Sequence, residues 1–155
     1  IKSKEYLPDD IEITLAGDIS TLNFDFDQQN LENNNFKFLS HRIDDEDMYE
    51  LFKETDIVVL PYRKTYMYGT SGVFQQAMFA NKPVICPNIY PFDKSVEIFE
   101  CGETFNAENP ESLAQKISLM KNSDISIYKK KMSDFKDNIN DWNDISNILI
   151  NEFKI

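Results

Sequence analysis

The sequence predicts an α/β domain built on an open parallel sheet with helices on both faces. Short apolar runs alternate with segments of helical periodicity along the chain. The middle runs, Ile57–Leu60 and Pro83–Cys86, are almost continuously apolar, as strands buried on both faces are. The repeated order of strand, helix and strand favours parallel pairing through crossover helices. We treat residues 1–155 as a single domain.

The five expected strands are Ile11–Gly17, Phe36–Leu39, Ile57–Leu60, Pro83–Cys86 and the weaker Glu103–Phe105. The segment 19–35 is polar, rich in asparagine and without periodicity, which indicates a loop. Residues 1–10 resemble a helix end and a turn. Because a sheet of this kind begins with a strand, we expect a preceding strand outside the sequence, so that the chain is a truncated domain.

The expected helices are marked by their first residues. One begins after Asp44 or Asp45, a second near Ser71 or Gly72, and a third at Pro110. In each, apolar side chains recur at steps of three and four residues. The same steps continue from residue 128 to 153 and predict a long, amphipathic helical tail whose apolar stripe packs against the core.

Composition excludes several classes of function. The chain carries 16 Lys and Arg against 27 Asp and Glu, a formal net charge of −11, which argues against nucleic-acid binding. It has no apolar run long enough to span a membrane and no signal peptide. Cys86 and Cys101 lie beside apolar segments, so we expect buried free thiols in a reducing, cytoplasmic setting. The one histidine, His41, argues against a histidine metal site or a catalytic triad.

The sequence Gly-Thr-Ser-Gly at residues 69–72 opens the second helix, directly after the third strand. In open parallel sheets, ligands bind beyond the carboxyl ends of the strands. The first N–H groups of a helix lack partners within it, and small residues let a phosphate approach them. Thr70 and Ser71 offer hydroxyls, and Arg63 and Lys64 offer positive charge. An ordinary turn with one capping residue would explain the same pattern. The P-loop and dinucleotide fingerprints are both absent.

Five motifs, in order, give the chain a family resemblance. They are "IEITLAGD", "NFKFLSHRIDDEDMYELFKETDIVVLPY", "QQAMFANKPVICPN", "GETFNAENPESLAQKI" and "INDWNDISNILINEF". Together they resemble the C-terminal, donor-binding domain of a retaining, family 4-like glycosyltransferase of the GT-B fold (glycosyl transferases group 1). The resemblance implies a Rossmann-like half of that fold. It also implies transfer of a hexosyl group from a nucleotide-diphosphate sugar in bacterial polysaccharide or glycoconjugate synthesis.

The resemblance also implies a set of donor-binding residues. The glycine turn would hold the diphosphate through Gly69, Thr70, Ser71 and Gly72, without a metal or other cofactor. Arg63 and Lys64 would add charge. The family has two glutamates around this turn, and their positions here hold Tyr68 and Gln76. Gln76 keeps the capacity to bind a ribose diol, whereas Tyr68 supplies an aromatic ring instead of a carboxylate.

The base of the nucleotide would lie near the turn after the second strand, at His41 and Arg42, with Gly17 at the end of the first strand. A surface turn explains His41 equally well. For Arg42 the competing interpretation is an ion pair with the acidic run Asp44–Asp47. No catalytic residue is assigned from the sequence.

The resemblance implies partners beyond the donor. They are a saccharide or lipid-linked acceptor, an N-terminal domain outside this sequence, and peripheral membrane association of the full-length protein. The isolated domain would then be inactive, because a GT-B site lies between two domains. The alternative is a non-catalytic scaffold domain in a polysaccharide-assembly complex. A signalling receiver domain would need an acceptor aspartate after the third strand, where this chain has Pro61 and Tyr62.

Overall fold

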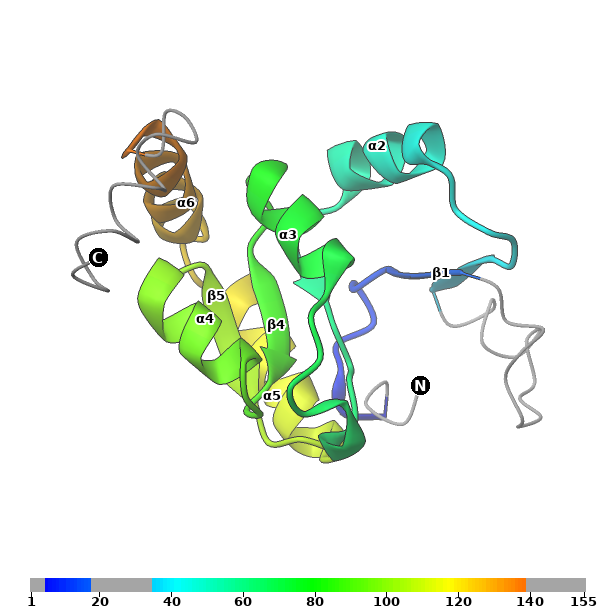
Figure 1. Ribbon diagram of the computed structural model, residues 1–155. Coiled ribbons are helices and arrows are strands. Elements are labelled where there is room, and N and C mark those ends of the chain that lie inside the picture. Colours follow the sequence, from blue (N-terminus) through cyan, green and yellow to red (C-terminus); the bar gives the residue numbers. More distant parts are fainter. Residues whose placement is uncertain (1–4, 18–34, 139–155) are drawn as a thin grey trace.

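The computed structural model describes residues 5–17 and 35–138 and has an α/β architecture (Figure 1). Two parallel strands, β1 (Ile13–Ala16) and β2 (Phe36–Leu39), form one sheet. Three more, β3 (Val58–Val59), β4 (Val84–Pro87) and β5 (Gly102–Phe105), form a second parallel sheet in that order. All five expected strands are present, with ends that differ from the expected ones by at most two residues. The α/β class with parallel strands is confirmed.

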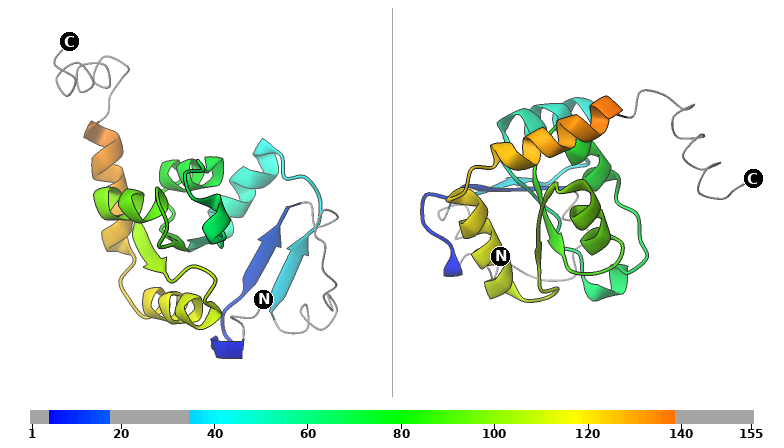
Figure 2. Two further views of the ribbon diagram at one scale, coloured as in Figure 1. Left: turned by 60° about the horizontal axis from the view of Figure 1, so that its bottom comes forward. Right: turned by 90° about the vertical axis from the view of Figure 1, so that its left-hand side faces the viewer.

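The sequence predicts one open sheet, but the structure has two, because β1 and β3 are not hydrogen-bonded to each other. The N–H of Ile13 in β1 donates to the carbonyl of Asn35 just before β2, and the N–H of Gly17 just after β1 donates to the carbonyl of Leu39 at the end of β2. On β3, the N–H of Val58 donates to Pro83 beside β4. Figure 2 shows β1 and β2 side by side and apart from β4. The two sheets are joined by apolar packing, because Ile13 of β1 packs against the same apolar cluster that contains Ile85 of β4.

Within residues 5–17 and 35–138, five α-helices accompany these strands: α2 (Asp45–Glu54), α3 (Gly72–Phe79), α4 (Phe92–Phe99), α5 (Pro110–Lys121) and α6 (Ser126–Asn138). The expected helix starts are confirmed at atomic detail. Asp44 caps α2 by accepting from the N–H of Asp47, and Ser71 caps α3. Asn109 caps α5 by accepting from the N–H of Ser112, with Pro110 at the first helical position.

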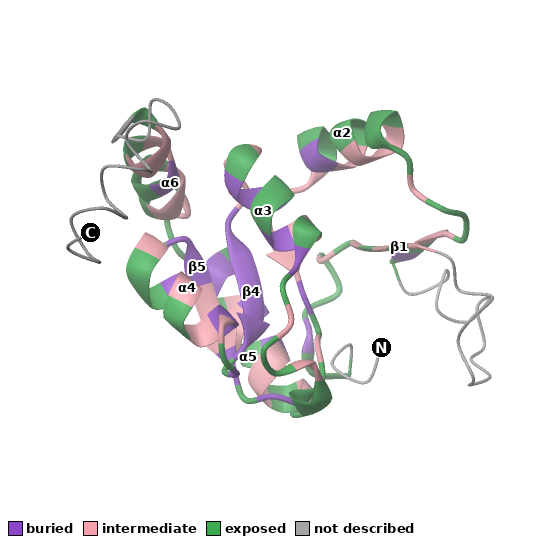
Figure 3. Ribbon diagram, in the orientation of Figure 1, coloured by how far each residue is buried: buried purple, intermediate pink, exposed green. Residues whose placement is uncertain are grey.

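The core lies on both sides of β4. Val84 and Cys86 face the cluster built with α3, α4 and α6, whereas Ile85 faces the cluster built with α5. All three side chains are 0% exposed. Figure 3 shows β4 buried along its length, while β1 alternates between exposed and intermediate residues. Helices therefore cover both faces of the second sheet, as the continuous apolar strand predicts.

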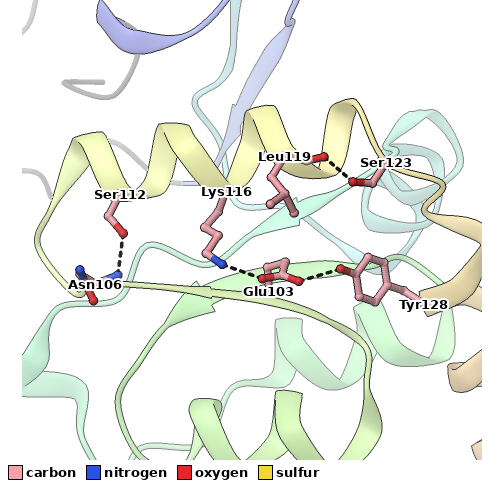
Figure 4. A network of polar contacts seen from close by, with 7 residues as sticks. All are labelled: Glu103, Asn106, Ser112, Lys116, Leu119, Ser123 and Tyr128. Carbon is pink, nitrogen blue, oxygen red and sulfur yellow. Dashed lines mark hydrogen bonds and ion pairs between the residues drawn. The ribbon is translucent and has the colours of Figure 1, made fainter.

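A polar network ties β5 to α5 and α6 (Figure 4). Glu103 accepts from Lys116 of α5 at 2.8 Å and from the hydroxyl of Tyr128 of α6 at 2.7 Å. Burial by itself would raise the pKa of Glu103, but the hydrogen bonds from Lys116 and Tyr128 and the lysine charge outweigh it, so the pKa is lowered. Burial, together with the hydrogen bond to Glu103, raises the pKa of Tyr128 to about 12.

Both cysteines are free and buried, as expected from their apolar surroundings. Burial raises the pKa of the Cys86 thiol and of the Cys101 thiol to about 12. The amphipathic tail is confirmed as far as α6, where Met132 is 0% exposed in the core. The loop expected over 19–35 and the tail beyond 138 lie outside the described residues, apart from Asn35.

Candidate functional site: the start of helix α3

The start of α3 is a capped helix end that opens onto free space. The cap, Ser71, is only 6% exposed, and its Oγ accepts from the N–H of Phe74 at 3.1 Å. The same oxygen shares a 2.9 Å hydrogen bond with the hydroxyl of Tyr62. A Cβ placed on Gly72 would meet nothing within 4 Å. No hydrogen bond within the described part of the chain uses the N–H groups of Gly72 and Val73, the first two of the helix, and Gly72 itself is exposed.

Aromatic side chains that the sequence analysis did not assign brace the turn before this helix. The hydroxyl of Tyr66 donates to the carbonyl of Thr70 at 2.6 Å. Tyr66 stacks on Tyr62 with 4.2 Å between ring centroids and 8° between ring planes, and Tyr62 stacks in turn on Phe92 of α4. In the sequence, the two tyrosines are marked only by their four-residue spacing along this loop. The same spacing is typical of core residues, so it did not identify them as residues that brace the turn.

Gly69 is required by this brace. A Cβ on Gly69 would lie 2.6 to 2.9 Å from ring atoms of Tyr66, closer than a real contact allows. The sequence analysis expects Gly69 to let a phosphate approach the backbone. The structure adds a second reason for a glycine here, which is the close packing of the Tyr66 ring. Gly72, by contrast, has open space beside it, so the two glycines of the turn serve different purposes.

The basic residues before the turn are accessible. Arg63 and Lys64 are exposed at the start of the short 3-10 helix η3 (Lys64–Tyr66), and neither has an ion-pair partner within the described residues. Thr70 and Gln76 are also exposed, the latter on the second turn of α3. The expected residues from Arg63 to Gln76 thus lie on one loop and on the first two turns of the helix it enters.

Gly17, His41 and Arg42 belong to the other sheet. They follow the carboxyl ends of β1 and β2, and the N–H of Gly17 donates to Leu39. His41 pairs with Asp47 through a 2.9 Å contact from Nε2 to Oδ2, so it is the histidine that meets the acidic run of α2. Among the described residues, no hydrogen bond or ion pair links this group to the turn at Gly69. The structure thus brings the expected residues from Arg63 to Gln76 together on one loop and helix start, whereas Gly17, His41 and Arg42 follow the strands of the other sheet.

Other kinds of site are not evident in the part of the chain that the structure describes. No group of three His, Cys, Asp or Glu side chains gathers there in a way that could hold a metal ion. None of its helices combines the length and the apolar character that crossing a membrane would require. A shallow hollow of about 490 Å³ lies on α5, lined by residues such as Tyr6, Ala114 and Leu119, and no residue of the turn contributes to it.

Comparison with known proteins connects this geometry to a family. The sequence matches the family model described as Glycosyl transferases group 1 over residues 1–122. That range includes both sheets, the turn before α3 and all of the expected donor-binding residues. No curated protein matches the chain.

Proposed function

The chain belongs to the glycosyl transferases group 1 family, and from this premise we propose that it binds a nucleotide-diphosphate sugar at the start of α3. In this proposal the domain supports retaining transfer of a hexosyl group to a saccharide or lipid-linked acceptor. The observation that carries the proposal is the open helix start, where Ser71 satisfies one N–H and leaves those at Gly72 and Val73 for a ligand.

The chemistry of the transfer suits this position. When the bond between the sugar's C1 and the diphosphate breaks, the leaving diphosphate gains negative charge. The N–H groups of residues 72 and 73 can donate hydrogen bonds to its oxygens, and the positive end of the helix dipole favours the anion. Arg63 and Lys64, both exposed and on the same loop, supply full positive charges for it. The braced turn keeps these donors in place, so little reorganisation is needed during transfer.

The flanking residues fit a nucleotide sugar only in part. The exposed amide of Gln76 can hydrogen-bond the ribose hydroxyls. His41 and Arg42 are proposed to lie toward the base, although His41 is paired with Asp47 here and would have to exchange this partner for the ligand. Tyr68 cannot act as a carboxylate.

A charge introduced at Gly72 tests the proposal. Aspartate at the first helical position favours the helix dipole, so Gly72→Asp should fold normally while repelling a phosphate. Titration calorimetry with UDP and GDP should show binding to the wild-type chain that weakens at least about tenfold in Gly72→Asp. Gly72→Asn, which matches aspartate in size without its charge, is the matched control and should weaken binding less than Gly72→Asp does. Equal affinity in all three proteins, or no binding of either nucleotide to any of them, would contradict the proposal.

One observation favours a second candidate, a non-catalytic scaffold domain. Positions 68 and 76 carry Tyr and Gln, so neither offers the carboxylate that the resemblance leads one to expect there. Incubating the chain with radiolabelled nucleotide sugars and saccharide acceptors separates the two candidates. Nucleotide binding without any transfer or donor hydrolysis, in the chain and in its full-length parent, favours the scaffold.

A further inference from the structure

Two exposed tyrosines stand together beside the start of α3. Tyr68, three residues before the cap Ser71, is 76% exposed, and Tyr90, between β4 and α4, is 52% exposed. Their ring centroids are 5.6 Å apart and their planes are tilted by 56°. Met67, which is 49% exposed, precedes Tyr68. Two loops from the carboxyl ends of neighbouring strands thus present aromatic rings to solvent at one place.

The two loops that carry these rings are joined to each other by a backbone hydrogen bond. The N–H of Tyr68 donates to the carbonyl of Tyr90 at 3.1 Å, which couples the two loops directly. Tyr66, two residues before Tyr68, stacks on Phe92, the first residue of α4, with ring centroids 6.0 Å apart, and both side chains pack in the apolar core. The backbones of the two loops that carry the exposed rings are therefore held together. A surface with little freedom to lose binds a ligand at lower entropic cost.

Folding alone does not account for Tyr68. Its φ of 69° lies in the left-handed region, where a bulky residue is an outlier and glycine or asparagine would be favoured. Its ring gains little from burial in return. Backbone strain at an exposed residue is a reason to look for function.

We propose that Tyr68 and Tyr90 form a binding site for a pyranose ring of the acceptor saccharide. The proposal rests on the function proposed above, because it places the acceptor next to the diphosphate cradle at Gly72. Tyrosine rings take up the C–H faces of a pyranose, and their hydroxyls can exchange hydrogen bonds with the sugar's own hydroxyls. Met67 extends the apolar surface toward a neighbouring sugar unit.

The geometry favours a saccharide over other ligands. A flat nucleobase could lie on only one of two rings that are tilted by 56°, whereas a puckered ring with hydroxyls around its edge can touch both. A neutral saccharide is also not repelled by a chain whose formal net charge is −11. An anionic ligand needs the local donors at α3, and the tyrosine pair provides no positive charge.

Saccharide binding can be measured directly on the chain by saturation-transfer NMR and titration. The probes are the neutral trisaccharides maltotriose, mannotriose and cellotriose, together with UDP and GDP. The main variants are Tyr68→Asn, which removes the ring with a residue that tolerates positive φ, and Tyr90→Ala. Tyr49→Ala is the matched control, because Tyr49 is 62% exposed on α2, outside these loops. Circular dichroism establishes that each variant is folded.

At least one trisaccharide should bind the wild type, and each of Tyr68→Asn and Tyr90→Ala should weaken it about five- to tenfold, with Tyr49→Ala unchanged. Affinity for the nucleotide that binds should stay within about twofold in Tyr90→Ala and Tyr49→Ala, whose side chains are not among the expected donor-binding residues. The inference is overturned if no trisaccharide binds, or if Tyr49→Ala has the same effect. It is also overturned if Tyr90→Ala loses nucleotide affinity to the same extent as saccharide affinity, since the pair would then belong to the donor. If the wild type binds a nucleotide but no trisaccharide, this inference fails while the function on which it rests stands.

Discussion

The two sheets of this protein use strands of the same kind in different surroundings. In the β3–β4–β5 sheet, β4 is covered by helices on both faces, and Val84, Ile85 and Cys86 are all 0% exposed. In the β1–β2 sheet, residues of β1 alternate between intermediate and exposed. Because free energy from burial scales with the apolar area removed from water, the first sheet should dominate stability. The candidate site extends from the carboxyl end of that better-buried sheet.

The largest expected difference concerns core side chains. Ile85→Ala, in β4, should lower the free energy of unfolding by about 2–5 kcal/mol, since it leaves a cavity between packed layers. Leu15→Ala, in β1, should cost about 1 kcal/mol, because Leu15 is only half-buried. Urea denaturation followed by circular dichroism measures both. Equal costs at the two positions would remove the basis of the comparison.

Hydrogen exchange compares the two sheets without mutation. The N–H of Val84 bonds to Cys101 within the buried sheet, and the N–H of Ile13 bonds to Asn35 beside β2. Exchange at Val84 should require global unfolding, whereas exchange at Ile13 should proceed by local opening. We expect protection of Val84 to exceed that of Ile13 by at least about 100-fold, measured by NMR. Similar protection would indicate that the two sheets unfold as one unit.

The buried thiols predict a loss of stability at alkaline pH that arises in the better-buried sheet. Burial raises the pKa of Cys86 and Cys101 from 9.0 to about 12. The neutral thiols therefore stabilise the folded chain below pH 9, and this contribution falls as the pH rises from 9 toward 12. Between pH 9 and 10 the loss should be about 1 kcal/mol per thiol, measured by urea titration.

The double variant Cys86→Ala/Cys101→Ala is the control for this effect. It should be less stable at pH 7 because of its cavities, yet its stability should fall less steeply between pH 9 and 11. In the wild type, both thiols should resist alkylation at pH 8 until denaturant is added. An equally steep fall in the double variant would show that other groups cause the alkaline loss.

The smallest expected effect compares one ion pair from each sheet. Glu103 and Lys116 are 25% and 33% exposed, whereas Lys37 and Glu12, between β2 and β1, are 61% and 59% exposed. Glu103→Gln should cost about 1 kcal/mol at pH 7, as expected for a buried hydrogen-bonded charge. Lys37→Met should produce no measurable change, since solvent screens such pairs. A measurable cost for Lys37→Met would contradict this contrast.

The pH dependence of the Glu103→Gln effect follows from the direction of the pKa shift. The folded pKa of Glu103 is lowered, so its charged form stabilises the fold above the unfolded pKa. This contribution is lost as the pH falls through the folded value. The difference between wild type and Glu103→Gln should therefore shrink from pH 7 to pH 3 in thermal melts. A constant difference would mean that the network does not depend on the charge of Glu103.

The candidate site was predictable where it depends on neighbours in the chain. A serine followed by a helical pattern predicted the cap at Ser71. The position of this segment after an apolar strand predicted that the turn lies at the edge of the sheet. The bracing by Tyr62 and Tyr66, the coupling of Tyr68 to Tyr90, and the contact of Gly69 with Tyr66 were not predictable. They depend on how loops fold back, which local periodicity does not encode.

Apolar periodicity and capping are local properties, so the α/β class and the five strands could be predicted from the sequence alone, and the starts of α2, α3 and α5 could be placed to within one residue. Only the tertiary structure decided that the strands divide into two sheets, since strand periodicity is the same whichever neighbour a strand pairs with. The tertiary structure also decided that Glu103 meets Lys116 and Tyr128, and that Tyr90 meets Tyr68. Such contacts join residues that are distant in the chain, and they form only when the packing of helices on strands brings those residues together.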